Sequence, residues 1–203
     1  MDGAGQVREP ANPALGAELR HVLTAPHQRL LLAIPTMDEN GPKYNNWKVR
    51  QARMLKFLQP GHTYYSAFIS RPDSAPAIRT PAYARRLVSL WSGKRVVLVS
   101  EPETAIMRLV ERTLEGGTLT HVACPHRQAY AQIDRIEKEV LAARPDIALL
   151  SCGPAATCLA NRLAHGNLQA IDIGSAGGFL LHELFGAANT LRVFALGFPR
   201  TGT

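Results

Sequence analysis

Polar and glycine-containing segments follow several apolar stretches in the second half of the chain. In residues 151–157 (SCGPAAT) an apolar stretch ends at Gly153, and a predicted helix begins at Pro154. Glycine lets the backbone approach a ligand closely, and the N–H groups and dipole of a helix N-terminus favour a phosphate. Ala156 is small enough to leave room, and Thr157 offers a hydroxyl. The segment is therefore either a phosphate-binding bend or an ordinary tight turn with proline in the first helical turn.

Two further positions offer polar groups directly after a predicted strand. Asp172 begins the glycine-rich segment 172–178 (DIGSAGG), and it can accept ribose hydroxyls, hold a metal ion or serve as a structural carboxylate. This segment lacks both the GxGxxG pattern and a Walker lysine, which excludes a P-loop NTPase. Arg71 can meet a phosphate or carboxylate with two hydrogen bonds, or it can form a surface salt bridge.

The elements that must position these residues alternate between strand and helix. We predict strands at 95–100, 119–124, 147–152 and 168–173, with helices at 102–115, 128–143 and 154–165. Outside this region we predict helices at 15–23, 47–58, 81–91 and 179–185, and strands at 29–35, 63–70 and 191–196. Alternating strands and helices indicate βαβ units, and fully apolar strands need cover on both faces. The predicted fold is α/β: a Rossmann-like open, mostly parallel sheet with helices on both faces, whose ligands bind beyond the carboxyl ends of the strands.

Length and composition favour one globular unit. The chain has 203 residues, of which 46% are hydrophobic and 19% charged, so it is neither a disordered chain nor a coiled coil. Residues 1–13 are predicted to form an irregular arm, and residues 14–203 a single domain. Three cysteines in apolar stretches favour a reducing compartment, and we find neither a secretory signal nor an apolar run long enough to span a membrane. We expect a cytoplasmic protein.

The charge points to an anionic partner without choosing one. The net charge is +7. This excess indicates either an arginine-rich surface or binding to a nucleotide, a nucleic acid or an anionic membrane surface.

Four segments resemble the GT-D-type glycosyltransferases, a family long known only as a domain of unknown function. They are YSAFISRPD (65–73), GKRVVLVSEPE (93–103), ACPHRQAYAQID (123–134) and LLSCGPAATCLANRLAHGNLQAIDIG (149–174). The resemblance covers roughly residues 19–174. Its most specific part is Gly-Pro-x-Ala-Thr-x-Leu-Ala followed by Gln-Ala-Ile-Asp-Ile-Gly.

The resemblance implies that a sugar is transferred from a nucleotide diphosphate sugar, with uridine as the expected base, to an acceptor hydroxyl of a glycan or glycoprotein. It places Gly153, Pro154, Ala156 and Thr157 along the diphosphate, and Asp172 and Gly174 in the rest of the nucleotide pocket. Arg71 would neutralise donor phosphate or position the acceptor. An acceptor hydroxyl must lose its proton, and Asp73, Glu101 and Glu103 are the candidate bases.

The sequence departs from the family at its metal element. Relatives hold a divalent cation, manganese or magnesium, with an Asp-x-Glu element near the N-terminus. Here Asp2 is the only candidate, and Ala4 stands where the glutamate would be. Cations such as Arg71 and Arg127 would then replace the metal, or the chain is truncated at its N-terminus. The alternatives are a non-catalytic nucleotide-binding relative that has lost its metal site, and a basic protein that binds or modifies nucleic acid.

Overall fold

The computed structural model describes residues 11–25, 28–34, 54–70 and 79–186. The predicted site residues Asp2, Arg71 and Asp73 lie outside these ranges, as do the predicted strand at 191–196 and most of the helix predicted at 47–58. The domain boundary predicted after residue 13 stays a prediction. In the described part, helix α1 (Pro13–Thr24) begins there, and the side chain of Asn12 caps it by accepting from the N–H groups of Ala14 and Leu15.

A four-stranded parallel sheet forms the centre of the molecule. Its strands are β3 (Arg95–Ser100), β4 (Thr118–Ala123), β5 (Ile147–Leu150) and β6 (Gln169–Asp172), in the spatial order β4-β3-β5-β6. All three pairings are parallel. Strand β5 is buried throughout, as its uninterrupted apolar sequence predicts for a central parallel strand.

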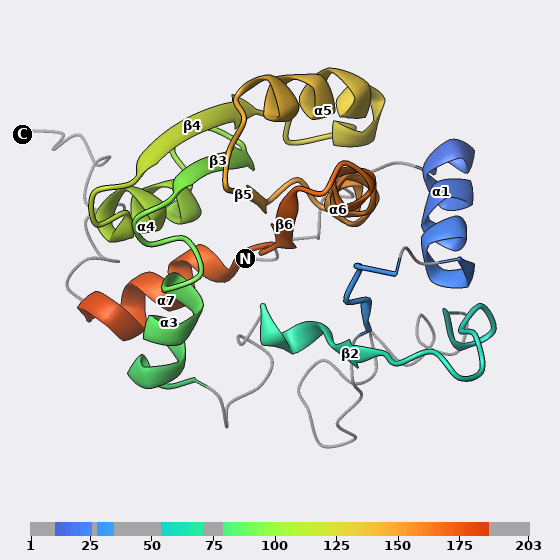
Figure 1. The fold of residues 1–203 in the computed structure, drawn as a ribbon, viewed down its shortest axis with the longest axis horizontal. Coiled ribbons are helices and arrows are strands. Elements are labelled where there is room, and N and C mark those ends of the chain that lie inside the picture. The colour runs from blue at the N-terminus through green and yellow to red at the C-terminus, as the bar shows by residue number, and fades with distance from the viewer. Residues whose placement is uncertain (1–10, 26–27, 35–53, 71–78, 187–203) are drawn as a thin grey trace, which may run out of the picture.

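Helices cover both faces of this sheet, which confirms the predicted α/β architecture (Figure 1). They are α3 (Pro81–Val88), α4 (Ala105–Thr113), α5 (Ile133–Ala142), α6 (Ala155–His165) and α7 (Ala176–Phe185). With α1, helices α5 and α6 form one core, while α3, α4 and α7 form the other. Side chains along β3 alternate between the two cores: Val97 and Val99 lie in the first, Val96 and Leu98 in the second.

The direction of the connections changes between two neighbouring strands. The chain leaves β3 through α4 on one face and continues to β4, and it leaves β5 through α6 on the other face and continues to β6. Strands β3 and β5 are adjacent. Their outgoing loops therefore diverge and open a crevice at the carboxyl ends of the strands, which is where ligands bind in open α/β sheets.

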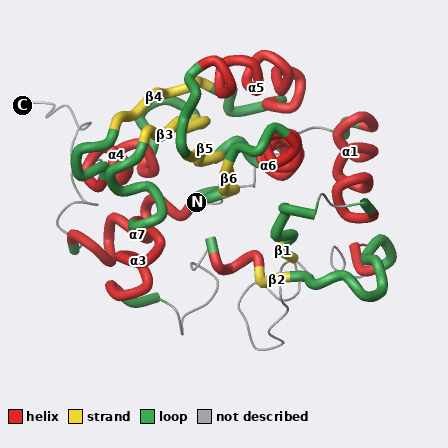
Figure 2. Tube along the Cα trace, viewed as in Figure 1, coloured by secondary structure: helices red, strands yellow, loops and turns green. Residues whose placement is uncertain are grey.

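The first half of the chain departs from the predicted strands. Among the described residues of this half, only β1 (Ala33–Ile34) and β2 (Tyr65–Ser66) form strands, and they pair in parallel as a separate two-stranded sheet (Figure 2). The aromatic composition of residues 63–70 favours a strand, but the Ser66 side chain accepts from the N–H of Phe68 and starts a 3-10 helix at Ala67–Ile69. A local side-chain-to-backbone hydrogen bond thus ends the strand early.

Two helices begin later than predicted for a local reason. Glu103 and Gln128 have left-handed backbones, with φ of 56° and 58°. A residue in that conformation cannot continue a right-handed helix. Helix α4 accordingly starts at Ala105, and α5 is preceded by a 3-10 turn, η4 (Ala129–Gln132). No helix within the described ranges is long and apolar enough to cross a membrane.

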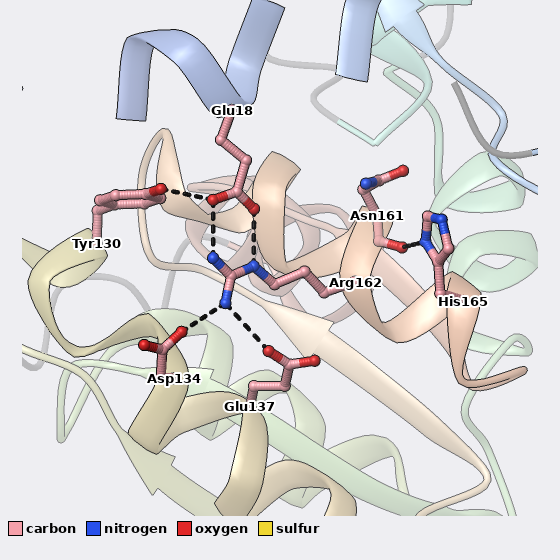
Figure 3. A network of polar contacts seen from close by, with 7 residues as sticks. All are labelled: Glu18, Tyr130, Asp134, Glu137, Asn161, Arg162 and His165. Atoms are coloured by element: carbon pink, nitrogen blue, oxygen red, sulfur yellow. Dashed lines mark hydrogen bonds and ion pairs between the residues drawn. The ribbon is translucent and has the colours of Figure 1, made fainter. Parts of the chain in front are cut away.

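A polar network ties α6 to α1 and α5 (Figure 3). Arg162 donates to both carboxylate oxygens of Glu18, at 2.7 and 2.8 Å, and its third nitrogen reaches Asp134 at 2.6 Å and Glu137 at 3.2 Å. The Tyr130 hydroxyl donates to Glu18 at 2.5 Å. The paired hydrogen bonds from Arg162 lower the pKa of Glu18, and the bond to Glu18 raises the pKa of Tyr130 to about 12.

The network matters for function because of the helix that it holds. Arg162 lies in the last turn of α6, and the first turn of α6 follows Gly153. A two-pronged contact between a guanidinium and a carboxylate fixes the relative orientation of the two side chains. The network therefore restrains the helix whose N-terminal end borders the crevice.

Candidate functional site

A small pocket lies at the carboxyl edge of the sheet, where the loops after β3, β4 and β5 meet. Its lining residues come from these three loops and the start of η4: Glu101, Cys124, Pro125, His126, Ala129, Ser151, Cys152 and Gly153. Two of the predicted site residues, Glu101 and Gly153, are brought together here although they are 52 positions apart in the sequence. The pocket therefore coincides with the crevice that the sheet topology creates.

The bend at Gly153 has a left-handed backbone with open space beside it. Gly153 has φ of 63°, and a Cβ at this position would meet no atom within 4 Å. The backbone conformation thus favours glycine, and the space beside it is open. The N–H of Ala156 donates to the carbonyl of Gly153 at 3.0 Å. Within the described residues no hydrogen bond occupies the N–H of Gly153 or of Ala155, so two amides remain to meet a ligand.

The residues that follow Gly153 differ in their exposure. Pro154 is exposed and occupies the N-cap position of α6. Ala156 is fully buried in the core, so its side chain supports the bend from behind. The expectation that its small size leaves room for a ligand stays a prediction, and the open space that the structure shows is at Gly153.

A carboxylate–histidine pair stands on the other side of the pocket. Glu101 follows β3, and His126 comes three residues after the end of β4. The Nδ1 atom of His126 lies 2.8 Å from Oε1 of Glu101, and the two side chains are 44% and 29% exposed. An ionised carboxylate only accepts hydrogen bonds, so Nδ1 is the donor in this contact, and in the neutral imidazole the lone pair is on Nε2. His126 was not among the predicted site residues, although its position after a parallel strand is the signal that identifies it.

Of the other predicted residues that the structure describes, Thr157, Asp172, Gly174 and Glu103 do not line this pocket. The Thr157 hydroxyl is 3.3 Å from Oδ2 of Asp172, which joins α6 to the end of β6. The Ser151 hydroxyl donates to the carbonyl of Gly174 at 2.8 Å. These contacts link the segment after β6 to the Gly153 bend. Glu103 is exposed.

The described residues do not supply a divalent cation site. No three His, Cys, Asp or Glu side chains among them lie close enough together to hold a metal ion. At the pocket, Glu101 offers one carboxylate and already accepts from His126. Magnesium and manganese prefer several oxygen ligands, and this carboxylate alone does not provide such a set.

A parallel α/β sheet with a pocket at the divergence of its connections defines a Rossmann-like ligand-binding protein. The model of the family described as "Glycosyltransferase GT-D fold" matches residues 8–177, and the chain belongs to this family. The resemblance drawn from the sequence motifs is thereby confirmed. The chain carries the fold of a glycosyltransferase.

Solved structures show the same fold. One is described as "a new glycosyltransferase (DUF1792) from Streptococcus sanguinis"; it is 23% identical with a TM-score of 0.73, and the match covers 92% of this chain and 74% of that one. Another is described as a highly conserved domain of unknown function 1792 with a distinct glycosyltransferase fold; it is 22% identical with a TM-score of 0.72, covering 91% and 71%. No curated protein matches the chain.

Proposed function

We propose that this protein is a glycosyltransferase that uses a nucleotide diphosphate sugar, with uridine as the base, and transfers the sugar to a hydroxyl of a glycan or glycoprotein. The donor diphosphate would lie against the bend at Gly153. The acceptor hydroxyl would approach from the side of Glu101 and His126. Family membership supports sugar transfer, and the donor and its placement are our proposal.

The observation that supports this placement best is the open space at Gly153 beside two unoccupied amides. A diphosphate needs hydrogen-bond donors that carry partial positive charge and do not first have to break a hydrogen bond to another group of the protein. The N–H groups of Gly153 and Ala155 are such donors, and they stand at the N-terminal end of α6, where the helix dipole adds to them. Ser151 and Cys152 extend the same edge of the pocket.

The other predicted residues have proposed roles around this contact. Asp172 is half-buried, and with Gly174 it would complete the nucleotide pocket and accept ribose hydroxyls. Thr157, whose hydroxyl meets Asp172, would hold that carboxylate in place. Arg71 would neutralise donor phosphate, and Asp73 remains a candidate base. Asp2 remains the candidate ligand for manganese or magnesium.

The departing nucleoside diphosphate carries negative charge that must be stabilised. Arg127 is exposed in the loop that carries His126, and the whole chain has a net charge of +7. These cations favour an anionic donor.

The three cysteines are buried thiols, which supports our further proposal of a reducing, cytoplasmic location.

Isothermal titration calorimetry with uridine diphosphate, its sugar derivatives and the other nucleoside diphosphates, with and without manganese, tests the proposal. We expect saturable binding of at least one nucleotide sugar and release of the nucleoside diphosphate from it. Binding with no release under any condition would instead support the non-catalytic relative. No binding of any nucleotide, together with a salt-sensitive shift of DNA or RNA in a gel, would favour the nucleic-acid alternative and reject the proposal.

A further inference from the structure

We infer that His126 is the catalytic base of this site and that Glu101 is the residue that positions it. The inference rests on the proposed function, because it names the group that would activate the acceptor beside a bound donor. It assigns a role to His126, ahead of Glu101 and Glu103 among the sequence-based candidates for the base.

The geometry fixes which nitrogen of His126 can act. Nδ1 donates to Glu101 at 2.8 Å, so in the neutral imidazole Nε2 holds the lone pair. Within the described part of the chain, Glu101 is the only hydrogen-bonding partner of the His126 side chain. Nε2 is therefore available to a hydroxyl in the pocket, while the other side of the ring is held in place. A carboxylate that orients an imidazole through Nδ1 is the arrangement by which hydrolases prepare a histidine to take a proton.

His126 and the bend lie on opposite sides of one small pocket. Both His126 and Gly153 line it, and they follow β4 and β5, the two strands on either side of β3. A donor whose diphosphate contacts the Gly153 amides would place its anomeric carbon toward the loop after β4. This is the side from which an attacking hydroxyl must come in a direct displacement.

The step balances without a further reactant. Nε2 of His126 takes the proton of the acceptor hydroxyl as the acceptor oxygen forms a bond to the anomeric carbon of the sugar. The bond between that carbon and the diphosphate oxygen breaks, and its electron pair leaves with the nucleoside diphosphate. His126 becomes an imidazolium beside the Glu101 carboxylate, which stabilises it, and later gives its proton to solvent. A single displacement of this kind inverts the configuration at the anomeric carbon.

Two of the sequence-based candidates, Glu101 and Glu103, fit the role less well. Glu101 accepts from Nδ1, and that hydrogen bond makes its oxygen a weaker acceptor for a substrate proton. Glu103 is exposed and does not line the pocket. An imidazole also accepts a proton at a pH nearer neutrality than a carboxylate does.

The test uses the full chain and measures release of uridine diphosphate from a uridine diphosphate sugar, with water or an added glycan as acceptor. His126→Asn keeps an amide near the position of Nδ1 but removes Nε2. We expect the rate at saturating donor to fall by about 10²- to 10⁴-fold, with the calorimetric Kd for the donor unchanged. Imidazole added to His126→Ala should restore part of the rate. His21→Asn, on α1, is the matched control and should keep the wild-type rate.

Glu101→Gln tests the positioning role. The new amide can donate to Nδ1 and so favour the tautomer of His126 that carries its proton on Nε2. In that tautomer Nε2 has no lone pair and cannot act as a base. We expect a large fall in rate and a change of tautomer in the imidazole nitrogen resonances of His126, while Glu111→Gln on α4 changes neither.

Two outcomes separate the inference from the proposed function. If the wild-type chain binds the donor but His126→Asn releases uridine diphosphate as fast, or if neither releases any, the role of His126 is refuted and the donor site stands. A product of retained anomeric configuration would also refute it. If the wild-type chain binds no nucleotide sugar, the proposed function itself fails.

Discussion

Replacement of Gly153 by alanine separates the backbone role of this glycine from its role in binding. Gly153 has φ of 63°, and a Cβ there would meet nothing within 4 Å. The methyl group would therefore not collide with the protein, and the cost of Gly153→Ala to folding is only the left-handed conformation. That cost is about 1–2 kcal/mol, which corresponds to a fall in Tm of roughly 2–8 °C for a chain of this size.

The effect on the donor should be larger than this small loss of stability suggests. The new methyl group would occupy the open space through which a diphosphate reaches the N–H groups of Gly153 and Ala155. Losing one charge-assisted hydrogen bond costs about 1.5–3 kcal/mol, so the Kd for uridine diphosphate should rise by about 10- to 100-fold. Calorimetry gives the Kd, and differential scanning calorimetry gives the Tm.

Gly93 supplies the matched control. It has φ of 71° and equally open surroundings, but it precedes β3 and so lies at the opposite end of that strand from the pocket. Gly93→Ala should lower the Tm by a similar amount and leave the Kd as it is. Equal donor affinity in the two variants would refute the placement of the diphosphate at the bend, because backbone strain would then be the only consequence of either change.

Two further predictions concern the scaffold. A Cβ on Gly177 would collide with the backbone of Ile106, whereas one on its neighbour Gly178 would meet nothing within 4 Å. We therefore expect Gly177→Ala to lower the free energy of unfolding by about 2–3 kcal/mol and Gly178→Ala to raise it by up to about 1 kcal/mol. Denaturant titration measures both changes. Tyr130, with a pKa of about 12 in the folded chain against 10.0 ordinarily, contributes stability that is complete below pH 10 and is lost as the pH rises through 12. Glu18→Gln should return the phenol titration, followed by ultraviolet absorbance, toward pH 10, and an unchanged titration would show that Glu18 is not the cause.

Periodicity and composition were sufficient to predict the sheet. Apolar runs such as residues 147–150 have no polar positions at which a strand face could meet water, so a buried parallel sheet is their only stable arrangement. The same reasoning failed in the first half of the chain, where Ser66 turns a strand-like segment into a 3-10 helix. Left-handed residues other than glycine, such as Glu103, also escaped prediction, since nothing in their side chains marks that conformation.

The bend at Gly153 could be predicted because glycine and proline at a strand end leave a local signal. The pairing of Glu101 with His126 could not, because it depends on β4 and β3 lying side by side in register. Ser100 pairs with Ala123 in that register, so the residues that follow each strand emerge together. Spacing along the chain does not contain this information.

The sheet order also explains why catalytic groups would gather on three loops while none comes from within a strand. Side chains inside β3 and β5 are fully committed to the two cores, as the burial of Val96 through Val99 shows. Chemistry must therefore be supplied by residues that lie just past the last strand hydrogen bonds, where the backbone is still held but the side chain is released from packing. Glu101, His126 and Gly153 all satisfy this condition, and they follow β3, β4 and β5, three neighbouring strands of the described sheet. A glycosyltransferase built on this sheet needs both a site for the diphosphate and a base for the acceptor. The topology offers them on opposite sides of the same crevice.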